Sequence, residues 1–229
     1  MSLLTNLVAY YKLDETSGTT VIDSANTHTG TSANCTVNQT GIINKAYSFN
    51  GSSSWIDVTT NPNDFNFLGD FSVAAWVNFS STNVLRIVEK ETPSGAGNVN
   101  FGLIIVSKKA YAFLDVVGGA GSGSVTGGAD INNSAWHYLV MTRSGTTLTL
   151  YVDGSSVGTP ATVGSNAINN TTDLYIGVAP GPIQYFAGLI DEVGLWSRAL
   201  SSAEVLALYN SGNGLSFSFG NSNFLTFFS

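Results

Sequence analysis

Apolar and polar residues alternate with a period of two through most of this chain, and this feature limits the fold more than any other. Successive side chains of a β-strand point to opposite faces, so the period marks strands buried on one side only. Clusters of Gly, Asn and Ser interrupt the pattern at short intervals, as expected for tight turns between strands. The pattern predicts an all-β fold with strands near residues 7–13, 45–50, 54–59, 71–79, 84–90, 99–106, 109–117, 136–144, 146–153, 173–178 and 185–197.

Local turn and cap residues support this assignment. Ser144-Gly145 separates two alternating runs and predicts a tight hairpin, and Asp153-Gly154 supplies the positive φ angles of a type I′ turn. Near the C-terminus, Ser201 and Glu204 form a Ser-x-x-Glu capping box before an apolar run. This signal predicts one short helix near residues 201–211.

The composition limits the function classes. A chain of 229 residues with this pattern commonly forms one domain. The formal net charge of -7, with only 8 Lys and Arg residues, argues against nucleic acid or anionic lipid as the partner. Cys35 is the single cysteine, so no internal disulfide forms. Neither a signal peptide nor a membrane-spanning run is visible, so no membrane insertion is expected.

Several short motifs follow one another in a fixed order. They are Leu13-Asp14-Glu15-Thr16-Ser17-Gly18, Ala46-Tyr47-Ser48-Phe49-Asn50-Gly51, Phe71-Ser72-Val73-Ala74-Ala75-Trp76-Val77, Trp136-His137-Tyr138-Leu139-Val140, Leu150-Tyr151-Val152-Asp153-Gly154 and Ile190-Asp191-Glu192-Val193-Gly194-Leu195-Trp196-Ser197-Arg198-Ala199-Leu200. From about residue 7 to about residue 212, the chain resembles the concanavalin A-like, laminin G-like jelly-roll domains. The resemblance implies a two-sheet antiparallel jelly-roll sandwich with one short C-terminal helix. It assigns residues 1–214 to this domain and leaves 215–229 as an apolar tail.

The residues give no support for catalysis. A glycosidase needs two carboxyl groups beside the scissile bond, and laminarinase-like members of this fold carry them in a Glu-x-Asp-x-x-Glu strand that does not occur here. Glu89-Lys90-Glu91 is the nearest approach, and we expect it at a solvated strand end. We therefore expect a protein that is not an enzyme. The alternative is a glycoside-active member whose acids lie on other strands.

The resemblance also implies one calcium ion, held where an early Asp-Ser loop meets the late Asp-Glu-Val strand. Calcium takes six to eight oxygen ligands from carboxylates, Asn side chains and backbone carbonyls. The matching positions are Asp23 and Asp191, with Asn26 and the carbonyl of Gly51 as additional ligands. The loop departs from the Asp-Ser-Ser-Gly-Asn-Gly form of the family. In the alternative interpretation, Asp23 caps a turn and Asp191 is hydrogen-bonded within the core.

A glycan site needs an aromatic platform with polar partners in an exposed position. Trp55, Tyr111 and Tyr185 are the candidates, and each could equally belong to the core. We expect the other three tryptophans, Trp76, Trp136 and Trp196, to be buried.

The apolar tail is the candidate assembly segment. An exposed aromatic cluster is unfavourable unless it docks on another surface. The tail therefore packs on its own domain, on a sister subunit of a homo-oligomer, or on other proteins of a virus particle. The residues concerned are Phe217, Phe219, Phe224, Leu225, Phe227 and Phe228.

Two roles follow from these expectations. The first is a phage virion component, such as a capsid decoration or fibre protein, located on the virion surface and in contact with capsid proteins or a glycan. The alternative is a carbohydrate-binding adhesion module of a bacterial extracellular protein, located at the cell surface. The chain carries several Asn-x-Ser/Thr sequons, and one of them begins at Asn78 inside a predicted core strand. Because glycosylation there would be awkward, a bacterium or its virus is favoured as the source.

Overall fold

The computed structural model describes residues 2–58, 62–92, 99–116, 121–165, 168, 170–181 and 183–218. Eight strands form sheet A: β1 (Leu7–Tyr11), β4 (Thr36–Thr40), β5 (Lys45–Asn50), β7 (Phe71–Asn78), β12 (Trp136–Ser144), β13 (Thr147–Val152), β14 (Ser155–Thr162) and β16 (Ala187–Trp196). Eight more form sheet B: β2 (Thr20–Val21), β3 (Gly30–Ala33), β6 (Trp55–Val58), β8 (Leu85–Lys90), β9 (Val99–Val106), β10 (Lys109–Val116), β11 (Gly123–Thr126) and β15 (Leu174–Ile176). The described helices are η1 (Pro62–Phe65), α1 (Ser202–Tyr209) and η2 (Asn210–Gly212).

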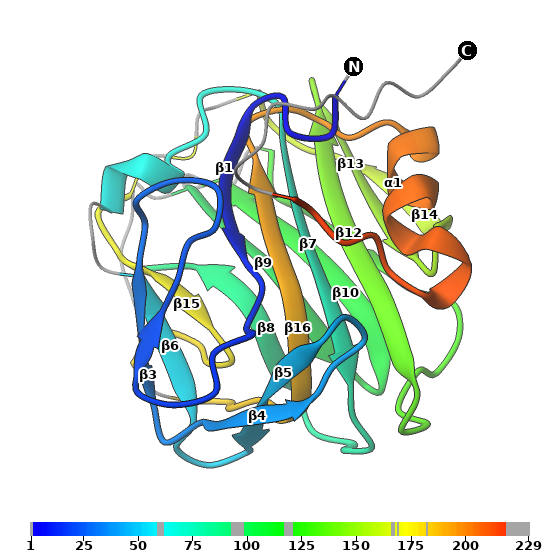
Figure 1. The fold of residues 1–229 in the computed structure, drawn as a ribbon. Coiled ribbons are helices and arrows are strands. Elements are labelled where there is room, and N and C mark those ends of the chain that lie inside the picture. Colours follow the sequence, from blue (N-terminus) through cyan, green and yellow to red (C-terminus); the bar gives the residue numbers. More distant parts are fainter. Residues whose placement is uncertain are drawn as a thin grey trace.

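The two antiparallel sheets pack face to face, and helix α1 lies outside sheet A (Figure 1). Sheet A runs in the order β14-β13-β12-β7-β16-β5-β4, with β1 paired to β16, and sheet B in the order β11-β10-β9-β8-β15-β6-β3-β2. The predicted two-sheet sandwich and its single short helix are confirmed. The capping box of α1 is also confirmed, since Ser201 accepts from the Glu204 amide and the Glu204 side chain accepts from the Ser201 amide.

Five strands were not predicted: β2, β3, β4, β11 and β14. They are short or polar, and most lie at or near a sheet edge. Strand β14 is mostly exposed and contains Pro160, a residue that sheets accept at their edges because it donates no backbone hydrogen bond. Pairing with a neighbouring strand stabilises these segments, and this contribution leaves no periodic signal in the sequence.

Apolar side chains from both sheets meet in one central core. A second apolar cluster covers the outward face of sheet A and contains Trp76, Trp196 and the helix residues Val205 and Leu208. The expected burial of Trp76 and Trp196 is confirmed, and Trp136 is half-buried against the same cluster. Within the described residues, no helix is long and apolar enough to cross a membrane.

The first part of the predicted tail packs on its own domain. Phe217 is buried in the outer cluster of sheet A, with its ring 4.8 Å from that of Tyr10 in an edge-on contact. Leu215 packs against the same cluster. Residues 215–218 therefore belong to the outer layer of the sandwich. The other predicted assembly residues, Phe219, Phe224, Leu225, Phe227 and Phe228, lie outside the described residues.

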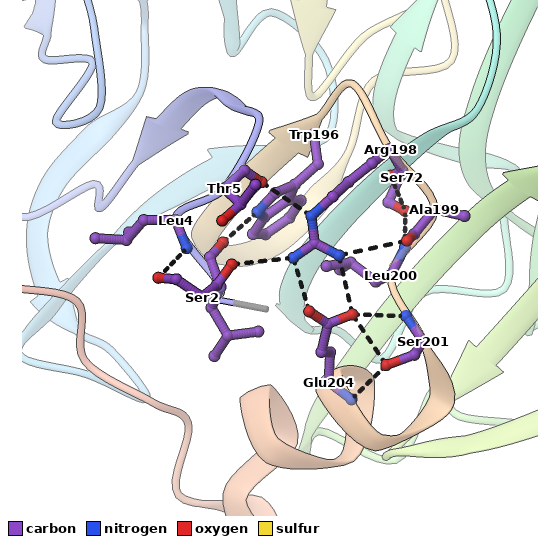
Figure 2. A network of polar contacts seen from close by, with 11 residues as sticks. Ser2, Leu4, Thr5, Ser72, Trp196, Arg198, Ala199, Leu200, Ser201 and Glu204 are labelled. Carbon is purple, nitrogen blue, oxygen red and sulfur yellow. Dashed lines mark hydrogen bonds and ion pairs between the residues drawn. The ribbon is translucent and has the colours of Figure 1, made fainter. Parts of the chain in front are cut away.

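An arginine joins the N-terminus to the end of β16 and the start of α1 (Figure 2). Arg198 donates from Nη1 and Nη2 to the two carboxylate oxygens of Glu204, at 2.9 and 2.8 Å. Its Nε donates to the Thr5 carbonyl at 2.9 Å. Burial raises the pKa of Glu204, but the hydrogen bonds from Arg198 and Ser201 outweigh burial and lower it overall. The network therefore fixes the N-terminal segment to the end of β16 and the start of α1, and it has a structural role.

Candidate binding face on sheet B

The strand register places a row of large side chains on the outward face of sheet B. Ala110 and Ala112 of β10 point into the core, so Tyr111 and Phe113 point outward. Tyr111 lies opposite Ile104 of β9, which lies opposite Arg86 of β8. These outward side chains are therefore neighbours across three strands.

An open groove of about 520 Å³ lies over this part of the sheet. Both Tyr111 and Phe113 are partly exposed in it. Gly102, opposite Phe113, leaves room for the ring, because a Cβ at that glycine would lie 2.3 Å from Phe113 Cε1. The lining residues are Arg86, Glu91, Ile104, Tyr111, Phe113, Leu114, Asp115, Ser122, Gly123 and Ser124.

Arg86 supplies the polar side of the groove. Its Nε and Nη2 donate to Gln184 Oε1 at 2.8 and 2.5 Å, and its Nη1 donates to Glu89 Oε2 at 2.7 Å. The Nη1 atom also lies 3.9 Å from Glu91 Oε2. Gln184 comes from the loop between β15 and β16, 98 residues away in the sequence. Gln184 and Glu89 therefore hold the Arg86 guanidinium from two sides.

The expectation of a solvated strand end at Glu89-Lys90-Glu91 is wrong for Glu89 and for Lys90, which are both buried. The side chain of Glu89 has no solvent exposure, whereas that of Glu91 is 35% exposed. Burial raises the pKa of Glu89 to about 9, the neighbouring Glu91 raises it further, and Arg86 lowers it. An irregularity of register between Arg86 and Val88 turns Glu89 to the outward face, where it lies opposite Gly102. The sequence pattern alone did not reveal this bulge.

The structure does not bring the three predicted aromatic residues into one site. Trp55 of β6 faces outward and packs against Tyr175 of β15, with ring centroids 5.9 Å apart. Four strand spacings separate β6 from β10, so Trp55 and Tyr111 are roughly 19 Å apart. Tyr185 is half-buried in the loop that carries Gln184. Only Tyr111 lines the groove. The alternation in β10 could have revealed Phe113, but Arg86 and Gln184 meet only through tertiary structure.

The predicted calcium ligand Asp23 is saturated by hydrogen bonds. Its Oδ1 accepts from the amides of Tyr10 and Ala25 at 2.9 and 3.0 Å. Its Oδ2 accepts from the His28 amide at 3.1 Å, and the His28 ring lies at the same distance. Asp23 is buried and stabilises the loop after β1, which is the turn-capping role of the alternative interpretation.

Asp191 also serves as a backbone acceptor. Its Oδ2 accepts from the amides of Ile42 and Ile43 at 2.9 and 3.2 Å. A bulge in β16 follows it, with Glu192 at a φ of 50°, and Glu192 accepts from the Tyr10 hydroxyl. Burial, and then repulsion by Glu192, raise the pKa of Asp191 to about 8, and burial raises that of Glu192 to about 7.

The four predicted ligands do not fit one calcium ion. Gly51 adjoins Ala187, whereas Asp191 lies four residues further along β16, about 13 Å away. Asn26 is exposed on the loop that Asp23 organises. Among the described residues, no three His, Cys, Asp or Glu side chains form a group that could hold a metal ion. We therefore derive no calcium-dependent chemistry from these residues.

Comparison with known proteins places the fold. The model of the concanavalin A-like lectin/glucanase superfamily matches residues 50–206. Part of adhesion G-protein coupled receptor V1 of Danio rerio is 24% identical over 150 residues, which are 62% of this chain and 2% of that protein.

Solved structures with low sequence identity show the same fold. The binding domain of Paraclostridial Mosquitocidal Protein 1 has a TM-score of 0.73 at 17% identity, covering 92% of this chain and 53% of that chain. The binding domain of botulinum neurotoxin DC, in complex with rat synaptotagmin II, has a TM-score of 0.69 at 14% identity, covering 92% and 52%. Trypanosoma rangeli sialidase in complex with sialic acid has a TM-score of 0.68 at 18% identity, covering 93% and 34%. The chain thus spans about half or less of each of these proteins.

Proposed function

The chain belongs to the concanavalin A-like lectin/glucanase superfamily, and on this premise we propose that it is a binding module that recognises a glycan on the outward face of sheet B. The observation that carries the proposal is the groove, in which two partly exposed aromatic rings lie beside a fixed guanidinium. Aromatic faces pack against the apolar faces of sugar rings, while a few placed polar groups bind the hydroxyls. Tyr111 and Phe113 supply the platform, and Arg86, Glu91 and Ser124 surround it.

We propose further that the module is not an enzyme. Glu89 neighbours Glu91 at the groove, but it does not line the groove and has no exposed surface with which to protonate a glycosidic oxygen. The other adjacent acid pair, Asp191 and Glu192, is buried on sheet A and engaged by backbone amides and Tyr10. Incubation with β-glucans, alginates and sialosides is expected to release no reducing sugar. Turnover that Glu89→Gln abolishes would support the glycoside-active alternative instead.

Binding is tested on a glycan array with the intact chain and matched variants. Tyr111→Ala and Phe113→Ala remove the platform and are expected to lower the affinity at least tenfold. Leu68→Ala is the control, because Leu68 is 84% exposed and does not line the groove. The proposal fails if the wild-type chain binds no glycan, or if both aromatic variants bind as well as the control.

We propose the surface of a phage particle as the setting, with the surface of a bacterium as the alternative. Asn78, the sequon residue on β7, donates its side-chain amide to the Ser134 carbonyl at 3.1 Å, which disfavours a glycan there and supports such a source. Mass spectrometry of purified virions tests the setting. Because Phe217 is part of the domain, an assembly test must delete only residues 219–229. Loss of oligomers or of virion association after this deletion is expected if the tail binds a sister subunit or a capsid protein.

A further inference from the structure

We infer that the groove on sheet B selects uncharged glycans and discriminates against sugars that carry a carboxylate or a sulfate. This inference rests on the proposed glycan-binding function and specifies the substrate class of the same groove. Its basis is the balance of charge around the two aromatic rings.

Among the described residues, Arg86 is the cation that lines the groove, and its donors are already engaged. Arg86 donates through three nitrogen atoms to Gln184 and Glu89, and its Nη1 lies 3.9 Å from the Glu91 carboxylate. An anionic sugar would have to displace Gln184 or compete with these two acids for the same guanidinium. Recognition of a carboxylate by arginine depends on a free fork of parallel N–H donors, and Arg86 does not present one.

Carboxylates lie on the solvent side of the groove. Glu91 is partly exposed at one end, and Asp115 is exposed on β10, two residues beyond Phe113. Lys109 is on the same face two residues before Tyr111, but its Nζ donates to the Gly128 carbonyl at 2.6 Å and lies 3.9 Å from Asp130. An incoming anion therefore meets two carboxylates, while the donors of Arg86 and Lys109 are engaged elsewhere, and the net charge of the chain adds to the repulsion.

The same groups suit sugar hydroxyls. A hydroxyl both donates and accepts, so it can donate to Glu91 or Asp115 and accept from Ser124 without moving the partners of Arg86. A further carboxyl group lies near the aromatic pair of Trp55 and Tyr175, since Asp57 is opposite Tyr175 in the sheet. Lys90, on the neighbouring strand, directs its Nζ to the Thr172 carbonyl. A longer glycan lying across the sheet would meet the same preference.

The experiment uses the full chain and an array of matched oligosaccharide pairs that differ only in a terminal sialic acid, a uronate or a sulfate. Each of the two carboxylates is expected to weaken binding of an anionic partner roughly threefold at ~6 Å in water, so the neutral member of a pair should bind about tenfold more tightly. The difference should shrink as salt is added, because salt screens the repulsion.

Glu91→Gln should raise the ratio of anionic to neutral affinity roughly threefold, because glutamine keeps an oxygen that accepts from a hydroxyl but carries no charge. Asp14→Asn is the matched control, since it removes one carboxylate near sheet A, where Asp14 accepts from the Lys45 amide. Equal or tighter binding of the anionic members overturns the inference but leaves the glycan site in place. Absence of binding to every member overturns the proposed function and the inference together.

Discussion

Replacing Glu89 by Gln is predicted to remove a large part of the pH dependence of stability. The folded protein raises the pKa of this buried carboxyl from 4.5 to about 9. Between these values the native state holds a proton that the unfolded chain has released, so stability falls as the pH rises. One unit of pH corresponds to about 1.4 kcal/mol, which gives at most about 4 kcal/mol between pH 5 and pH 8. The pKa of about 9 already includes the lowering by Arg86.

The assay is urea and thermal denaturation of the wild-type protein and the variant at pH 5, 6, 7 and 8. The variant is expected to be close to wild type at pH 5 and more stable at pH 8, with a melting temperature higher by up to roughly 8–16 °C for a chain of this size. Asp191 and Glu192, whose raised pKa values act in the same direction, are present in both proteins and cancel in the difference. Asp115→Asn controls for the loss of a negative charge on the same face.

Parallel stability curves for the wild type and Glu89→Gln, from pH 5 to pH 8, would refute the reasoning. They would mean that the Arg86 partner compensates fully for burial and that the carboxylate is ionised in the folded protein. A variant that is less stable at every pH would lead to the same conclusion.

Three further predictions concern stability. Arg198→Ala should lower the free energy of unfolding by about 3 kcal/mol, because it leaves the Glu204 carboxylate without its paired donors. Since the pKa of Glu204 is lowered in the folded protein, this stabilisation should be present above pH ~4.5 and disappear in the wild type on acidification. Denaturation at pH 3 and pH 7 measures the difference. Phe217→Ala should cost about 3 kcal/mol through the lost contact with Tyr10, whereas an unchanged denaturation midpoint would place the ring outside the core. If the ion predicted from the sequence binds, calcium at about 100 times Kd would add about 2.7 kcal/mol to the free energy of unfolding. Because Gly51 is separated from Asp191, we expect no rise in melting temperature when calcium is added. A rise that Asp191→Asn removes would contradict this expectation.

The local signals of the sequence determined the class of fold and the exposure of many side chains. Alternation is a property of neighbouring residues, so the strand at residues 109–116 and its outward Tyr111 follow from the sequence alone. The capping box likewise acts within one helical turn and predicted α1 correctly. Motifs in a fixed order indicated the family, which the match over residues 50–206 bears out.

Tertiary structure decided what those side chains do. The polar edge strand β14 forms because pairing with β13 provides partners for its backbone groups. The local sequence pattern contains no signal for this pairing. Asp23 and Asp191 looked like ligands for one ion, but each is surrounded by amides that the fold delivers from other segments. The groove depends on Arg86 meeting Gln184 across 98 residues and on a bulge that buries Glu89. Because such contacts are set by strand register and sheet order, the candidate binding face became visible only in three dimensions.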